Sequence, residues 1–281
     1  MINLPLVVLS LASFSSARPA FATELKPDTT RAFDQYVEGT EARINSEAAE
    51  PDHFFLFDAL PDDQRAAMIA RLKKGEIIAQ PMTTRENGEP IHVPGGLVHH
   101  WLAVAFIPGA TAEQALTLSQ DFSRDPELYK PDIQDARVLS RHGDDFRVFM
   151  RLYRHAIVSV AYNAEFDVNY FIPDSSRNYN FQRSTKIQEI ENPGRPDEQD
   201  YPVGKDHGYL WRLNLYTLCQ NRDGGLYMQV EFLALSRTVP AIFAWLVDPY
   251  IHSIPRDYLK HFLDTTRKAL ISNTLPGAET H

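Results

Sequence analysis

The residues of this chain whose types suit acid-base chemistry are His99-His100 and Asp206-His207, and the residue whose charge most needs a partner is Arg183. An imidazole gains and loses its proton near neutral pH, and a neighbouring carboxylate can orient it as a general acid or base. Asp206-His207 precedes an expected strand, and its spacing suits either an acid-base pair at a cavity mouth or an ordinary surface loop. Neither His99-His100 nor Asp206-His207 is part of a catalytic signature, so we predict no catalytic residue.

The two adjacent histidines belong to an expected strand, because residues 98 to 107 alternate until Pro108-Gly109 ends the run. Adjacent strand residues point to opposite faces, so His99 and His100 cannot ligate one metal ion. The ten histidines form no His-x-His, His-Glu-x-x-His or Cys/His cluster, and the nucleophile-elbow, phosphate-loop and dinucleotide motifs are absent. We therefore expect no metal and no cofactor, with one histidine at a sheet edge and the other satisfied in the core.

The composition limits the class of protein and of partner. With 281 residues, of which 43% are hydrophobic, the chain can bury one large core or two modest ones. Its formal net charge is −9, and the sequence has no concentrated run of Lys or Arg. Nucleic acids and anionic membrane surfaces need a concentrated positive field, so we expect no nucleic-acid partner.

The N-terminus has the pattern of an export signal. An apolar run, Leu4–Leu11, is followed by Ala20-Phe21-Ala22, the small-x-small pattern that signal peptidase reads. We predict a signal peptide over residues 1–22 and a chain that is periplasmic or secreted. The first three residues carry no Lys or Arg, which leaves a misplaced start or an uncleaved anchor as alternatives. The next apolar run, Ala241–Val247, is far shorter than the roughly 20 residues that span a bilayer, so the mature chain is expected to have no transmembrane segment.

The remaining pattern predicts helices around a sheet. Helical spacing over Thr29–Ala48 and Arg65–Leu72 gives an N-terminal helical extension over residues 23–94, and period-two strands then begin a second domain over 95–281. A polar loop, Asn192–Asp206, interrupts the strands. Thr111, with Gln114 in the capping-box position, starts a helix. Two helices, Pro240–Tyr250 and Pro255–Ser272, end the chain, and the second carries an apolar stripe that must lie on the sheet.

Two hairpins can be aligned, because a one-residue slip would move every apolar side chain to the wrong face. A turn at Pro173–Ser176 pairs, on a buried face, Tyr170 with Tyr179, Val168 with Phe181, Phe166 with Arg183 and Tyr162 with Ile187. A turn at Asn221–Gly224 pairs Trp211 with Ala234, Leu213 with Phe232, Leu215 with Val230 and Thr217 with Met228. The reverse side of the second hairpin is expected to be a solvated surface with a contact between Asn214 and Glu231.

This order of elements resembles a known group of folds. The strand and turn LVHHWLAVAFIPGAT, the helical segment AEQALTLSQDFSRDPELYKPDI, the strand segment VLSRHGDDFRVFMRL, further antiparallel strands and a long C-terminal helix follow one another over residues 95 to 272. They resemble the START-like (SRPBCC) helix-grip superfamily, which includes birch-pollen-allergen-like, polyketide cyclase-like and coenzyme Q-binding proteins. The resemblance implies an α+β fold in which a curved antiparallel sheet wraps around the C-terminal helix and leaves a cavity.

Arg183 stands on an otherwise apolar expected face, and its permanent charge requires a carboxylate, backbone carbonyls or a ligand anion. One interpretation is a buried ion pair or a side chain that reaches the cavity rim, and the other is an anchor for a ligand headgroup. The residues expected to line the cavity are Arg183, Tyr162, Phe166, Phe181, Trp211, Leu213, Phe232, Leu259 and Phe262.

Three functions are compatible with these features. The first is non-enzymatic binding or carriage of a hydrophobic or amphipathic small molecule, such as a lipid, quinone or polyketide, in the cavity. The second is a cyclase or hydrolase-like enzyme that uses the same cavity with His100, Tyr162 or His207 as acid or base. The third is a structural or interaction protein whose cavity is filled by its own side chains or by the N-terminal helices. We favour the first, because no motif demands an enzyme.

The export signal gives a direct test. Protein recovered from the exported fraction of a bacterial host is expected to begin at Thr23, and N-terminal sequencing measures this. A soluble protein that still begins at Met1 would contradict the predicted localisation.

Overall fold

The structure is a computed structural model that describes residues 23–155, 159–238 and 241–272. The predicted signal peptide, residues 1–22, lies outside the described residues. Within the described ranges, no helix is long and apolar enough to cross a membrane.

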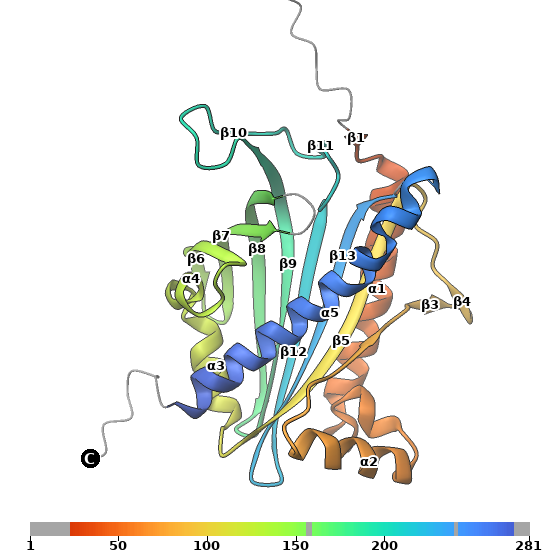
Figure 1. Ribbon diagram of the computed structural model, residues 1–281. Coiled ribbons are helices and arrows are strands. Elements are labelled where there is room, and N and C mark those ends of the chain that lie inside the picture. The colour runs from red at the N-terminus through yellow and green to blue at the C-terminus, as the bar shows by residue number, and fades with distance from the viewer. Residues whose placement is uncertain (1–22, 156–158, 239–240, 273–281) are drawn as a thin grey trace, which may run out of the picture.

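A large antiparallel sheet forms the centre of the molecule (Figure 1). Its strands lie in the order β2-β5-β13-β12-β9-β8-β7-β6. The short strand β10 pairs with the last two residues of β9. Their bounds are β2 Ile78–Pro81, β5 Gly96–Pro108, β6 Ile133–His142, β7 Asp145–His155, β8 Ser159–Asp174, β9 Arg177–Glu191, β10 Gln199–Asp200, β12 Arg212–Arg222 and β13 Gly225–Arg237. β2 lies inside the segment that the sequence predicts to be a helical extension, so the sheet begins before residue 95.

The helices follow the predicted order. They are α1 (Pro27–Ala49), α2 (Asp62–Lys73), α3 (Ala112–Gln120), α4 (Asp125–Leu128) and α5 (Ala241–Ile271), with short 3₁₀ turns η1 (Pro51–His53), η2 (Leu56–Ala59) and η3 (Phe122–Arg124). The capping box of Thr111 and Gln114 at the start of α3 is confirmed. The two expected C-terminal helices form a single helix, α5. Short pairs complete the fold, namely β1 (Thr23–Glu24) with β11 (Lys205–Asp206) and β3 (Arg85–Glu86) with β4 (Glu89–Pro90).

Helices cover both faces of the sheet. We call the face that carries α5 the α5 face and the opposite one the α1 face. On β5, Ala103 and Ala105 pack in the same cluster as Leu259 and Leu263 of α5, whereas Leu102 and Val104 pack with α1. Because neighbouring strand residues point to opposite faces, α1 and α5 lie on opposite sides of β5. Figure 1 shows α5 running diagonally across the strands, with α1 beside β5 at one edge of the view.

The register of the β8–β9 hairpin differs from the expected one. Val168 pairs with Gln182 and Phe166 with Ser184, so the expected pairing of Phe166 with Arg183 is wrong by one residue. The turn occupies two residues, because Asp174 pairs with Arg177, and Thr185 is left unpaired as a bulge. The shift places Arg183 and Phe181 on the α1 face.

The β12–β13 hairpin is shifted by two residues, which keeps Leu213, Leu215 and Thr217 on their expected face. Leu213 pairs with Ala234 and Leu215 with Phe232, because Asp223-Gly224 alone forms the turn. Both turn residues have positive φ, 55° and 76°, which is the backbone of a tight two-residue hairpin.

The reverse side of this hairpin is buried, so the expectation of a solvated surface is wrong. The residues concerned are Asn214, Tyr216, Leu218, Gln229, Glu231 and Leu233, each at most 4% exposed. The N-terminal helix and the turns that follow it cover them. Asn214 faces Leu233 rather than Glu231 and donates to the Tyr216 hydroxyl at 3.1 Å.

The predicted fold class is confirmed: an α+β fold in which one antiparallel sheet grips a long C-terminal helix, with additional helices from the N-terminal segment. The expected opposite orientations of the two adjacent histidines are also confirmed. His100 is buried on the α1 face, while His99 contacts Ser236 on the other side of the strand.

Two neighbouring leucines test this arrangement. Leu233→Asp is expected to cost several kcal/mol of unfolding free energy, because it places a carboxylate in the fully buried α1 face. Leu213→Asp, on the partly exposed part of the α5 face, is expected to cost clearly less. Urea unfolding of both variants measures the difference, and equal losses would mean that the two faces are equally closed.

Candidate ligand-binding site

The α5 face is closely packed where the C-terminal half of α5 lies on β5 and β13, and we call this region the inner end. Small and branched side chains of β5 and β13 meet Leu259, Leu263 and Leu270 of α5, and all are buried. The sheet residues are Ala103, Ala105, Ile107, Leu226, Met228 and Val230. Because α5 lies directly on these short side chains, this end of the face holds no open apolar surface.

The outer end of the α5 face is less completely covered. Large apolar side chains there remain partly exposed although they pack against the core clusters. We call this set the open patch, and it consists of Trp101, Leu152, Val160, Leu210, Leu213, Phe232, Tyr258 and Phe262. The strand residues among them come from β5, β7, β8, β12 and β13. Apolar surface that a covering helix leaves open is where an apolar ligand gains most by burial.

A group of polar side chains borders the open patch, which we call the mouth group: Tyr162, Glu189, Asp206 and His207. Tyr162 of β8 lies directly opposite Glu189 of β9. The Nδ1 atom of His207 lies 2.6 Å from Oε1 of Glu189, and the backbone N–H of His207 donates to Oε2 at 3.2 Å. The loop between β9 and β12 therefore attaches to the α5 face through this carboxylate.

Burial governs the protonation of the mouth group. It raises the pKa of Glu189, and the hydrogen bond from His207 opposes that shift in part. Burial also raises the pKa of Asp206, whose Oδ1 accepts from Gly208 N at 2.7 Å while Oδ2 has no partner in the described part of the chain. The pKa of Tyr162 lies well above its ordinary value, chiefly through burial. The Tyr162 hydroxyl therefore keeps its proton at neutral pH and can donate a hydrogen bond.

The structure brings most of the predicted cavity residues together. Tyr162, Phe166, Leu213, Phe232, Leu259 and Phe262 lie on the α5 face or on the side of α5 that covers it. Phe181 and Trp211 do not, because both pack in the cluster around α1. The indole N–H of Trp211 donates to Asp206 at 3.2 Å.

Arg183 also lies on the α1 face, where it forms an ion pair. Its Nε and NH2 atoms donate to the two carboxylate oxygens of Glu41 in α1, at 2.5 and 2.8 Å, and NH1 donates to Asn169. The hydrogen bond to Glu41 raises the pKa of the guanidinium. The structure therefore corrects the expected position of Arg183 under the C-terminal helix and shows the ion-pair alternative.

A second polar network on the α1 face surrounds Glu231 of β13. His100 and Arg43 both donate to Oε1 of this carboxylate, and the Tyr36 hydroxyl lies 2.9 Å from the other ring nitrogen of His100. Burial alone raises the pKa of Glu231, but the hydrogen bond from His100 and the charge of Arg43 outweigh it and hold the pKa below its ordinary value. His100 is thus satisfied in the core. Among the described residues, no group of three or more candidate ligands could hold a metal ion.

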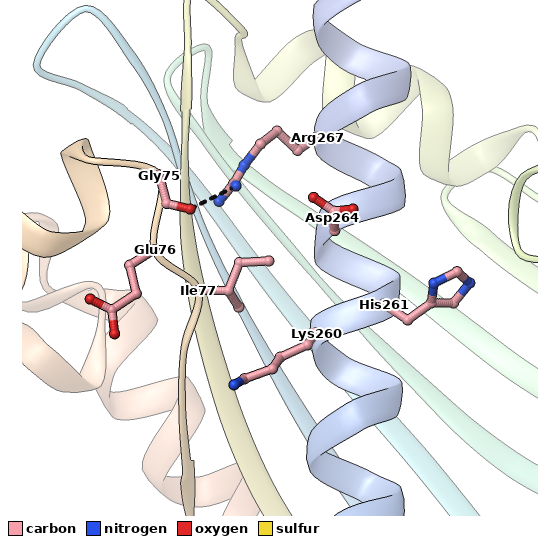
Figure 2. Close-up of a pocket in the computed structure, with 7 residues that line it drawn as sticks. All are labelled: Gly75, Glu76, Ile77, Lys260, His261, Asp264 and Arg267. Atoms are coloured by element: carbon pink, nitrogen blue, oxygen red, sulfur yellow. Dashed lines mark hydrogen bonds between the residues drawn. The ribbon is translucent and has the colours of Figure 1, made fainter.

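A polar groove of about 490 Å³ lies between the α2–β2 connection and α5 (Figure 2). Its charged side chains are Glu76, Lys260, Asp264 and Arg267, and Arg267 NH1 donates to the carbonyl of Gly75 at 2.9 Å. Figure 2 shows His261 pointing away from the connection, on the other side of α5. The mixture of opposite charges makes this groove a poor match for an apolar ligand.

The ion pair on the α1 face gives a testable consequence. Arg183→Met is expected to lower the unfolding free energy by roughly 1.5 to 3 kcal/mol, the range for hydrogen bonds to charged groups, because Glu41 loses its partner. The double variant Glu41→Gln/Arg183→Met is expected to recover part of this loss. Urea unfolding measures both, and a single variant as stable as the wild type would show that the pair contributes nothing.

Comparisons with known proteins find similarity to solved structures alone. No protein-family model and no curated protein sequence matches the chain. Among solved structures, the Zhui aromatase/cyclase from Streptomyces sp. R1128 is 9% identical and matches 66% of this chain and 100% of its own, with a TM-score of 0.45. A START superfamily protein from Mycobacterium smegmatis is 12% identical over 64% and 99%, with a TM-score of 0.39. Human STARD10 is 12% identical over 74% and 81%, with a TM-score of 0.41.

Proposed function

We propose that this protein binds a hydrophobic or amphipathic small molecule on the α5 face, between the open patch and α5. The contrast between the two covered faces carries this proposal. On the α1 face, large side chains such as Leu218, Leu233 and Leu235 are fully buried. On the α5 face, Trp101 and Phe232 remain partly exposed beside a helix that could have covered them.

Binding would be driven by apolar burial and oriented by polar contacts. Each 100 Å² of apolar surface removed from water contributes roughly 2.5 kcal/mol before the costs of ordering the ligand. The mouth group adds hydrogen-bonding side chains at one border of the patch, so a ligand with an apolar body and one polar end fits best. Lipids, quinones and polyketides share that chemistry. Binding and carriage need no chemical change of the ligand.

We also infer that the protein acts outside the cytoplasm, as the N-terminal pattern predicts. Cleavage after Ala22 would preserve β1, in which Thr23 pairs with Asp206 beside the mouth group. The exported chain would therefore keep the contacts that attach its N-terminus to the loop before β12.

The most direct test is native mass spectrometry of protein purified without detergent. A co-purified apolar molecule of defined mass, released on denaturation, is the expected result. A chain that carries nothing and also fails to bind added cis-parinaric acid would favour the alternative of a protein whose cavity is filled by its own side chains.

Matched phenylalanines locate the site. Phe232→Ala is expected to weaken binding of cis-parinaric acid by about fivefold to tenfold, because contact area in the open patch is lost. Phe149→Ala removes the same ring from the opposite side of the sheet, where Arg137 stacks on it at 3.7 Å, and is expected to leave affinity unchanged. Fluorescence titration of wild type and both variants measures the affinities. An equal effect of the two substitutions would place the ligand elsewhere.

A further inference from the structure

The His207 imidazole is held in one orientation, and its Nε2 atom is left without a hydrogen-bond partner among the described residues. Glu189 accepts at 2.6 Å from Nδ1, which fixes Nδ1 as the protonated nitrogen of the neutral ring. Tyr209 stacks on the ring with a centroid distance of 5.6 Å, and Tyr201 meets it edge-on at 5.5 Å. The Nε2 atom then carries a lone pair and has no hydrogen-bond partner within the described ranges.

The side chain of His207 is also accessible, whereas its carboxylate partner is not. The imidazole is 29% exposed and Glu189 is 5% exposed. A buried carboxylate that orients an accessible imidazole is the arrangement by which enzymes prepare a general base.

Tyr162 supplies the second group that such chemistry requires. Its side chain is 4% exposed, it lies directly opposite Glu189, and its hydroxyl has no hydrogen-bond partner among the described residues. Directly opposed strand residues have Cβ atoms about 5 Å apart, so the phenol and the Glu189–His207 pair belong to one site. The hydroxyl is therefore a hydrogen-bond donor that the fold leaves for a ligand.

We propose that the mouth group catalyses proton transfer at the carbon next to a ketone of a bound apolar molecule. His207 is the general base, Tyr162 is the donor to the carbonyl oxygen, and Glu189 is a positioning residue. This goes beyond the proposed function and rests on it, since the apolar body of the ketone would lie on the open patch.

The step is balanced without a further reactant. Nε2 of His207 takes the proton from the carbon, the C–H electron pair forms the C=C bond, and the carbonyl π pair moves to oxygen. The hydroxyl of Tyr162 stabilises that oxygen by a hydrogen bond. In the reverse step, the carbon takes a proton from the imidazolium, which exchanges with water. Acyl transfer through the protein would instead need a side-chain nucleophile hydrogen-bonded to Nε2, and the described residues provide none.

The charged and titratable groups that face His207 come from several elements. Glu189 lies on β9, Tyr162 on β8, Asp206 on β11, and Tyr201 and Tyr209 on the loop. Arg237 of β13 lies over the far partner of this stack, the Tyr209 ring, at 5.5 Å. The protonated imidazole formed during the step is stabilised by its hydrogen bond to Glu189.

The test uses 2-tetralone, an apolar ketone with acidic protons next to the carbonyl, in deuterated buffer. Proton NMR follows deuterium incorporation at C1 for the full-length protein and for an equal concentration of free imidazole. The protein is expected to accelerate exchange well beyond free imidazole. His207→Gln is expected to lose about 100-fold or more of the protein-dependent rate, the lower range for general base catalysis. Tyr162→Phe is expected to lose about tenfold or more.

Further variants separate catalysis from a structural effect. Glu189→Gln is expected to move the midpoint of the pH–rate profile to lower pH, because a neutral amide stabilises the imidazolium less. His142→Gln, an exposed histidine at the β6–β7 turn, is expected to leave the rate unchanged. Thermal unfolding of each variant shows that it is folded, and Tyr162→Phe decides the question if His207→Gln does not fold.

Binding of cis-parinaric acid is measured on the same samples. Binding without any acceleration of exchange over free imidazole would overturn the catalytic inference and leave the proposed function standing. Acceleration that survives in both His207→Gln and Tyr162→Phe would also overturn it. Loss of parinaric acid binding in the wild type would instead contradict the proposed function.

Discussion

The buried carboxylate of Glu231 constrains the whole α1 side of the molecule. Its side chain is 0% exposed in the middle of β13, where an unpaired charge would cost several kcal/mol. His100 of β5 and Arg43 of α1 both donate to its Oε1 atom, while Oε2 is buried with no partner among the described residues. Because Arg43 must reach Glu231, α1 has to lie across β5 and β13, and it closes this part of the face. The ion pair between Arg183 and Glu41 fixes the same helix over β9.

The two faces of the sheet consequently differ in how completely they are packed. The α1 face is sealed by large buried side chains and by ionic contacts that hold one helix in one position. The stability gained there allows the α5 face to remain incompletely packed at its outer end. On that face, Leu263 and Leu270 in the C-terminal half of α5 pack against small and branched side chains of β5 and β13. Separating the stabilising face from the open one would leave room for the proposed ligand on a stable fold.

The sequence predicts the elements well and their pairing less well. Apolar periodicity finds α1, α3, β5 and both hairpins, because each spacing reports one element's own geometry. Register depends on turn length, and the two-residue turn at Asp223-Gly224 was available as a type I′ signal. The covering of the α1 face also left a signal: β13 carries apolar residues at both parities, as in Leu233 and Phe232, which indicates burial on both sides. The partner of Arg183 could not be found this way, because Glu41 is far away in the chain.

The same features of β9 that remove Arg183 from the candidate site bring Glu189 into it. Before the bulge at Thr185, the one-residue shift turns Arg183 toward α1, while after the bulge Ile187 returns to its expected face. β9 then continues to Glu191, beyond the last residue that could be aligned from the sequence, so Glu189 falls opposite Tyr162. The sequence suggested a pairing of His207 with its neighbour Asp206, whereas the structure shows His207 hydrogen-bonded to Glu189. The histidine works with a carboxylate from a different strand, because a strand holds an acid on the ligand face more firmly than a neighbouring loop residue can.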